Sequence, residues 1–194
     1  MLSKETLGLL AVIFSVVAGS RYIWDVFEKR TKPHVFSWLV WGLFGAIVFF
    51  AQRSDAAGPG SWALGVSTVI CFLIALLAVR WGEKTITKSD VVSFIAALFA
   101  IALWCFTGSP LWSVMLAALI DTLGYYPTFR KSWLKPNEET AFLYSMDALM
   151  FLISLGALET YSLINVTYPL TIAVVNIVFV TMLFLRRRAS EKER

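Results

Sequence analysis

Long runs of hydrophobic residues alternate with short polar turns along this chain. Each run has about 20 residues, the length that an α-helix needs to cross a bilayer core of about 30 Å. The seven runs cover residues 6–28, 34–52, 60–80, 88–106, 110–130, 139–158 and 163–186. Helix-breaking turns such as Gly58-Pro59-Gly60 and Lys135-Pro136-Asn137 separate them. The pattern predicts an all-α integral membrane protein with seven transmembrane helices.

The composition supports this prediction and limits the kinds of cofactor and metal site that the chain can form. Of the 194 residues, 58% are hydrophobic and only 15% are charged, which is outside the usual balance of a soluble domain. Cys71 and Cys105 lie singly in apolar runs, and His34 is the only histidine. Because these residues cannot assemble a disulfide framework, a haem site or a metal cluster, we expect no cofactor and no metal.

The basic residues indicate how the chain is oriented. Fourteen of the seventeen Lys and Arg residues lie in the turns after the first, third and fifth runs or in the C-terminal tail. Basic loops stay in the cytoplasm, so the N-terminus is predicted outside and the C-terminus inside. The net charge of +4 follows from this topology, and we expect no nucleic-acid partner. The predicted partner is the lipid bilayer of the cell (inner) membrane, with a homo-oligomer left open.

The two halves of the chain form an internal repeat. At an offset of 103 residues, Tyr22 corresponds to Tyr125 and Trp41 to Tyr144, and both halves carry a basic turn that ends in Lys-Pro. This repeat predicts a three-helix unit (1–80), a linker transmembrane helix (81–108) and a second three-helix unit with a short basic cytoplasmic tail (109–194). A single linker helix leaves both units in the same orientation, which gives a parallel 3+1+3 repeat.

A short proline motif lies near the end of the fifth predicted span. Tyr126-Pro127-Thr128, followed by Arg130-Lys131-Ser132 and a short cytoplasmic turn, resembles the Pro-Gln or Pro-Thr signature of the PQ-loop and SWEET (MtN3-like) superfamily of seven-helix membrane transporters. The first half departs from the pattern, since the offset places Trp24-Asp25 at the matching position. The resemblance implies a 3+1+3 layout, an outside N-terminus, a substrate path between the units and alternating access.

Pro127 is the residue on which this resemblance places a hinge. Proline removes a backbone hydrogen bond and kinks its helix, and at membrane depth a neighbour or cavity water must satisfy the freed carbonyl. Gly124, three residues earlier, favours flexibility. A hinge that moves during transport and a static kink are both consistent with this sequence.

Charged residues inside the predicted spans are the main functional candidates. A charge near the bilayer centre costs about 2.5–3.5 kcal/mol on insertion scales, so such groups often mark pathways. Asp121 and Asp147 fall near mid-depth, where two carboxylates can bind a cation or exchange a proton. Their structural alternative is a hydrogen-bonded link between helices.

A second pair of charged residues lies near the end of the first span. Arg21 and Asp25 have the i, i+4 spacing of an ion pair, predicted on a face turned away from lipid. A pair between Arg21 and Asp121 across the repeat is the alternative. Asp25 is also a candidate gate charge at the cytoplasmic mouth.

The remaining candidates are uncharged. Asn176 lies near the middle of the last span and matches an Asn that contacts substrate in sugar-transporting members of the superfamily. Its structural alternative is an interhelical hydrogen bond. Tyr125 is predicted to line the same cavity. The repeat-equivalent residues Trp41 and Tyr144 are candidates to close the cavity floor or to stack on a substrate, with core packing as the alternative.

Together these features favour a membrane transporter that moves a small polar solute by alternating access, with coupling to a proton or another cation. A ligand-binding receptor or trafficking protein on the same fold is the alternative. An enzyme is not expected, because Asp121 and Asp147 lack the Gly-x-Gly-Asp context of an intramembrane aspartyl protease. A retinal protein is excluded by the absence of Lys from the last span.

Overall fold

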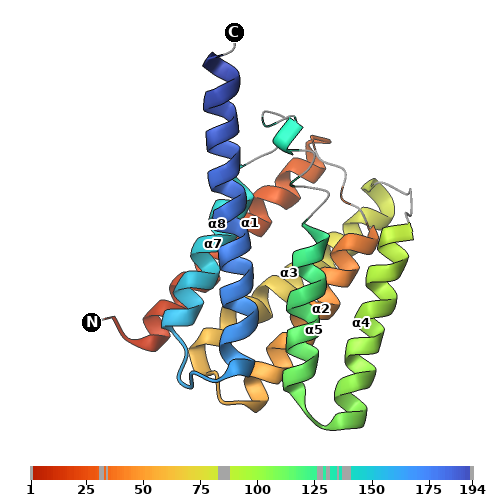
Figure 1. The fold of residues 1–194 in the computed structure, drawn as a ribbon, viewed down its shortest axis with the longest axis vertical. Helices are drawn as coiled ribbons and strands as arrows, with labels where there is room; N and C mark the ends of the chain where they lie inside the picture. The colour runs from red at the N-terminus through yellow and green to blue at the C-terminus, as the bar shows by residue number, and fades with distance from the viewer. Residues whose placement is uncertain are drawn as a thin grey trace.

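The chain folds into an all-helical bundle (Figure 1). A computed structural model describes residues 2–30, 33, 35–82, 88–125, 129, 132–134, 136 and 141–192. Within these ranges lie seven α-helices, which are α1 (Lys4–Phe27), α2 (Val35–Ser54), α3 (Trp62–Trp81), α4 (Lys88–Thr107), α5 (Pro110–Gly124), α7 (Ala141–Gly156) and α8 (Leu163–Lys192). A short 3₁₀ helix, η1 (Gly58–Ser61), leads into α3.

Several of these helices have the length and composition of membrane spans. In the described part of the chain, three stretches are long and apolar enough to cross a membrane: Lys4–Phe27, Gly58–Trp81 and Leu163–Ser190. The helices α5 and α7 are shorter and also apolar. Large apolar side chains face outward, with Leu76 70% and Phe106 90% exposed, as suits contact with lipid. The fold is therefore that of an all-helical protein with membrane-length apolar helices.

Two helix ends differ from the sequence prediction. Helix α5 ends at Gly124, six residues before the predicted limit. Glycine is among the poorest helix formers, which accounts for a helix end at this residue. Pro127 lies outside the described residues. Helix α8 instead continues to Lys192, because Arg186–Lys192 contains good helix formers and no glycine or proline.

Helix α8 is consequently longer than a membrane span. Its 30 residues measure about 45 Å at 1.5 Å per residue, against a hydrocarbon core of about 30 Å. Figure 1 shows its C-terminal end projecting beyond the other helices. The predicted basic tail is thus helical as far as Lys192, as an extension of the last helix.

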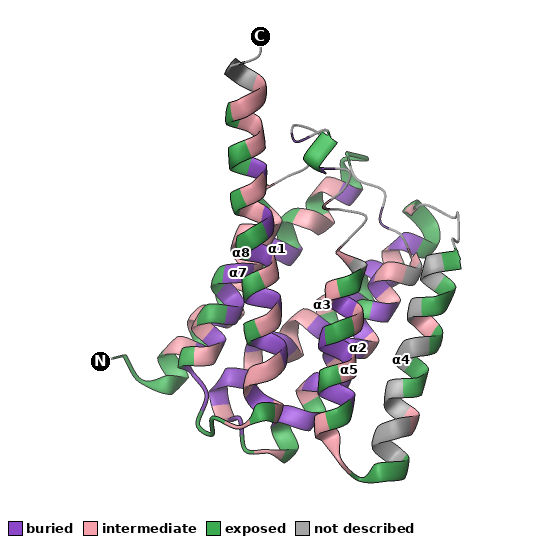
Figure 2. Cartoon of the chain, viewed as in Figure 1, coloured by how far each residue is buried: buried purple, intermediate pink, exposed green. Residues whose placement is uncertain are grey.

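The helices pack in two similar groups. Helices α1 and α2 contact α3, while α5 and α7 contact α8. Between the groups, α1 contacts α7 and α2 contacts α5, and α4 lies against α2 and α5. Figure 2 marks the buried residues, which lie mainly on the faces that these helices turn toward one another. The main core cluster includes Phe44, Val48, Ala117, Phe151 and Tyr168.

Glycines allow the closest helix approaches. A Cβ at Gly8 of α1 would lie 2.8 Å from both the side chain and the backbone oxygen of Pro59 in η1. A Cβ at Gly42 of α2 would lie 2.8 Å from the Phe72 ring of α3. Small residues at such crossings let helix backbones approach within a membrane, where van der Waals packing drives association.

Candidate functional site

Asp121 is held at the meeting of three helices. It follows Val114, Ala117 and Ala118 on the buried face of α5, at the i, i+3, i+4, i+7 spacing of one helix stripe. The Tyr168 hydroxyl of α8 donates a hydrogen bond of 2.9 Å to Asp121 Oδ2. The Trp41 indole of α2 is a second hydrogen-bond donor.

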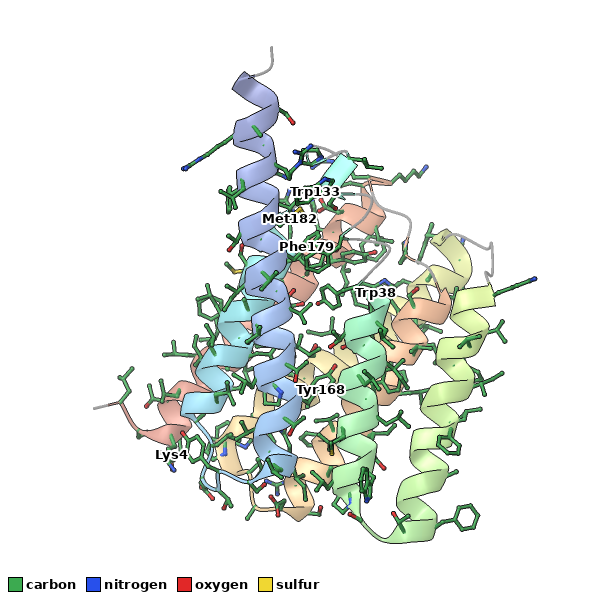
Figure 3. All side chains as sticks on the ribbon, viewed as in Figure 1. Lys4, Trp38, Trp133, Tyr168, Phe179 and Met182 are labelled. Atoms are coloured by element: carbon green, nitrogen blue, oxygen red, sulfur yellow. The ribbon has the colours of Figure 1, made fainter. Side chains whose placement is uncertain are left out.

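Asp121 is buried in the bundle. The residue is only 8% exposed, and Tyr168 approaches it from the second turn of α8 (Figure 3). Hydrogen bonds to an ionised acceptor are roughly twice as strong as neutral ones. The carboxylate is therefore positioned from three helices rather than left mobile.

A second carboxylate lies close to the first. Asp147 of α7 is half-buried and within electrostatic range of Asp121. Cys71 of α3 is buried and interacts electrostatically with both carboxylates. The structure thus brings together the two mid-depth Asp residues that the sequence singles out, at a level where α2, α3, α5, α7 and α8 meet.

Two tyrosines and an amide extend this site along α8. The Tyr125 hydroxyl, just beyond the end of α5, donates a hydrogen bond of 3.1 Å to Asn176 Oδ1. The Tyr125 and Tyr144 ring centroids are 6.2 Å apart, and Tyr144 packs on Phe179 at 4.4 Å. Tyr125 also interacts electrostatically with both carboxylates. We call the whole set the central polar cluster, comprising Trp41, Asp121, Tyr125, Tyr144, Asp147, Tyr168 and Asn176.

Asn176 has an unused hydrogen-bond donor. The residue is fully buried, and its Nδ2 atom has no hydrogen-bond partner among the described residues. An unpaired buried polar atom costs about 1–3 kcal/mol. The amide therefore offers a donor to a ligand at this position, beside the Tyr125 hydroxyl.

The sequence-predicted pair between Arg21 and Asp121 is wrong. Arg21 Nε lies 3.3 Å from Asp25 Oδ2, which confirms the ion pair predicted from the i, i+4 spacing. The pair does not face away from lipid, however, because the Arg21 side chain is 60% exposed. Arg21 is within two turns of the end of α1, so its long side chain can reach the membrane interface. Arg30, 4.0 Å from Asp25 Oδ1, joins the same group.

The central polar cluster belongs mainly to the second half of the chain. At the 103-residue offset, Asp121 corresponds to Ala18 and Asp147 to Phe44. Both of these residues are buried and apolar. Only Trp41 comes from the first half, so the two halves contribute unequally to the site.

Two of the sequence candidates take a limited part in the site. Trp41 is 43% exposed and meets the carboxylate with one edge. Gly124 is the last residue of α5, directly before Tyr125. Sequence reasoning missed Tyr168, although a hydroxyl-bearing ring six residues into an apolar helix was the available signal.

A second polar group joins the turns at the opposite end from the basic tail. The Gln52 Nε2 atom of α2 donates to the Asn165 carbonyl of α8 at 2.9 Å. The Asn165 Nδ2 atom donates to the carbonyls of Asp55 at 2.9 Å and Thr160 at 3.0 Å. The Ser162 hydroxyl donates to the Asp55 carboxylate. We call Gln52, Asp55, Ser162 and Asn165 the outer network.

The outer network links corresponding parts of the two halves. The turn after α2 and the turn after α7 meet there, and the Glu159 amide also donates to the Ala57 carbonyl at 3.1 Å. Gln52 and Asn165 are almost completely buried. Sequence reasoning did not predict these contacts, which join residues more than a hundred positions apart.

The clusters contain no metal site of conventional form. In the described ranges, no three His, Cys, Asp or Glu side chains are placed so that they could hold a metal ion together. Comparison with protein-family models, with curated proteins and with solved structures finds no match to this chain. Function is therefore inferred from the central polar cluster and the outer network.

Proposed function

We propose that the chain is a membrane transporter for a small polar solute, built from two parallel three-helix units joined by α4. The helix contacts support this architecture. A pseudo-twofold axis would exchange α1 with α5, α2 with α7 and α3 with α8. It would therefore exchange the α1–α7 contact with the α5–α2 contact, and both contacts are present. The basic residues favour an outside N-terminus and a cytoplasmic C-terminus.

The observation that carries the proposal is the pair of carboxylates inside the central polar cluster. Asp121 and Asp147 lie within electrostatic range of each other, and the ion pairs of the described residues involve neither of them. Carboxylates in a low-dielectric site are costly unless a proton or a cation compensates them. The solute is therefore positively charged or moves together with a proton or cation.

The rest of the cluster suits a polar ligand. Tyr125 and Asn176 present a hydroxyl and an unpaired amide donor, which can orient polar groups of a solute. Trp41 and Tyr168 each donate a hydrogen bond to Asp121, and such donors stabilise a negative charge on that carboxylate. A cation is thus favoured over an anion, because the charge that the site offers is negative.

The outer network supports alternating access. It joins the turns of both units at the end away from the basic tail, and in the proposed transporter these bonds hold the outer end closed. Each hydrogen bond contributes about 0.5–1.5 kcal/mol net, and the three side-chain bonds that join the two units together amount to a few kcal/mol. An energy gap of this size leaves a minor state that a solute can select. Outward opening would break the outer network and expose the central polar cluster.

Transport in proteoliposomes tests this function. Purified protein would first be screened for ligand-induced thermal stabilisation with amines, amino acids, sugars and carboxylates over a pH series. Uptake of each stabilising compound would then be measured with and without a pH gradient. We expect Asp121→Asn to abolish coupled uptake while the variant stays folded. Glu5→Gln is the matched control, because Glu5 is exposed in the first turn of α1 and lies outside the central polar cluster, and it should retain uptake.

The outcomes separate the competing functions. Ligand binding without uptake by the wild-type protein would indicate a receptor on this fold. Full uptake and an unchanged pH response in Asp121→Asn would show that the carboxylate is structural. Either result would overturn the proposed transport site.

A further inference from the structure

An apolar groove runs along the outer face of α8 near its basic end. It has a volume of about 530 Å³ and lies between α8 and residues 132–134, with Trp133 on one wall. Ile177, Thr181 and Leu185 line its floor along α8. Figure 3 shows Trp133 beside Met182 in this part of the helix. None of these residues belongs to the central polar cluster.

The dimensions of the groove match a lipid chain. Its lining extends from Ile177 to Ala189, which is about 18 Å along a helix at 1.5 Å per residue. One leaflet of the hydrocarbon core is about 15 Å thick, half of the full 30 Å. Leu185 is 62% and Trp133 54% exposed. The groove therefore presents an apolar track about as long as one leaflet is deep.

A fixed guanidinium group stands at the edge of the groove. Arg186 Nε donates a hydrogen bond of 3.1 Å to the Trp133 carbonyl, and its guanidinium carbon lies 4.8 Å from the centre of the Trp133 ring. Guanidinium has five N–H donors, of which the described hydrogen bonds use one. The remaining donors have the planar geometry that suits a phosphate group.

The adjacent residues strengthen the attraction for an anion. Arg187 and Arg188 follow on α8, and Arg187 Nε is bound to the Pro136 carbonyl at 3.0 Å. The charge distribution along the chain places this end at the cytoplasmic leaflet. Anionic lipids of that leaflet are attracted to clustered basic residues.

We propose that this groove binds one anionic glycerophospholipid of the cytoplasmic leaflet. An acyl chain lies along α8 between Trp133 and Leu185, and the phosphate group is bound by Arg186. The bound lipid lies between α8 and Trp133 and contacts both. The site is independent of the proposed transport function, because it uses different residues and requires only the membrane orientation.

Lipid retention by the purified full-length protein tests this site. Native mass spectrometry would count bound lipids after incubation with phosphatidylglycerol or with phosphatidylcholine that has the same acyl chains. We expect the wild-type protein to retain one phosphatidylglycerol and little phosphatidylcholine. Arg186→Gln should weaken phosphatidylglycerol binding about five-fold, the contribution of roughly one basic residue near an anionic surface.

Two further variants make the test specific. Thr181→Phe fills the groove without changing charge, so it should also lower retention. Arg80→Gln is the matched control, because Arg80 lies over the Trp81 ring at 5.3 Å but does not line this groove. It should bind like the wild-type protein.

Three results would overturn the proposal. They are equal retention of the two lipids by the wild-type protein, unchanged phosphatidylglycerol retention in either groove variant, and an equal loss in the Arg80→Gln control. If Arg186→Gln fails to fold, Thr181→Phe still decides the outcome, because full retention by that variant excludes an acyl chain in the groove.

Discussion

Replacing Asn165 by alanine should weaken the closure of the outer end. Asn165 is fully buried, and its amide nitrogen donates to the Asp55 carbonyl at 2.9 Å and the Thr160 carbonyl at 3.0 Å. Both carbonyls would lose this donor in Asn165→Ala. A buried polar group without a partner costs about 1–3 kcal/mol, and water at the outer surface can satisfy part of the loss. We therefore expect the free energy of unfolding to fall by about 2–4 kcal/mol.

Denaturant unfolding in detergent, followed by circular dichroism, measures this change. Thr171→Val is the matched control, because its hydroxyl donates only to the Thr167 carbonyl within α8 and its loss should cost less than about 1 kcal/mol. A second readout uses Ser61→Cys, placed at a fully buried position in η1, in a background without the native cysteines. A membrane-impermeant maleimide should label Cys at this position faster once Asn165 is also replaced.

The two measurements refute different parts of the reasoning. If Asn165→Ala is as stable as the wild-type protein, the outer network contributes nothing to the fold. If stability falls and maleimide labelling at position 61 is unchanged, the network is structural and does not control opening at the outer end.

Three other predictions address the site, the packing and the topology. Tyr168→Phe removes the hydroxyl that donates to Asp121. Thermal unfolding should show that the free energy of unfolding falls by about 1.5–3 kcal/mol, the contribution of a hydrogen bond to a charged group. An unchanged melting temperature would contradict this. Gly8→Ala should destabilise the fold by about 1–3 kcal/mol, because its Cβ would clash with Pro59. Gly156→Ala is the control and should be tolerated, because its Cβ would lie 3.5 Å from the nearest atom. Equal melting temperatures of the two variants would refute the packing argument. A C-terminal reporter fusion should be cytoplasmic and an N-terminal one external, and a cytoplasmic N-terminus would rule out the proposed 3+1+3 layout.

The helical framework was largely predictable because its signals are local. Apolar runs and helix-breaking turns predict most of the observed helix limits within a few residues. The two larger differences, at Gly124 and Lys192, arise where hydrophobicity and helix propensity diverge. The basic segment after residue 185 is too polar for a membrane yet well suited to a helix, so a hydropathy criterion ends α8 too early.

The candidate site was predictable only in part. Asp121 and Asp147 stand out because charge is rare in apolar spans, but their mutual proximity depends on how α5 packs against α7 and α8. Tyr168 is inconspicuous among apolar neighbours until α8 is placed beside α5. Asn165 and Gln52 occupy helix ends, where polar residues are ordinary, so their pairing across more than a hundred residues has no signature in a single sequence.

The unequal division of the central polar cluster constrains how the two units can vary. Both carboxylates belong to the second unit, and the corresponding residues of the first, Ala18 and Phe44, are apolar and buried. Two copies of the first unit placed face to face would enclose a hydrophobic interior without any charge to attract a cation. Two copies of the second would crowd four carboxylates into one low-dielectric space, where repulsion between like charges is strong. Under the proposed two-unit architecture, neither unit could therefore replace the other, and a working site would need one copy of each.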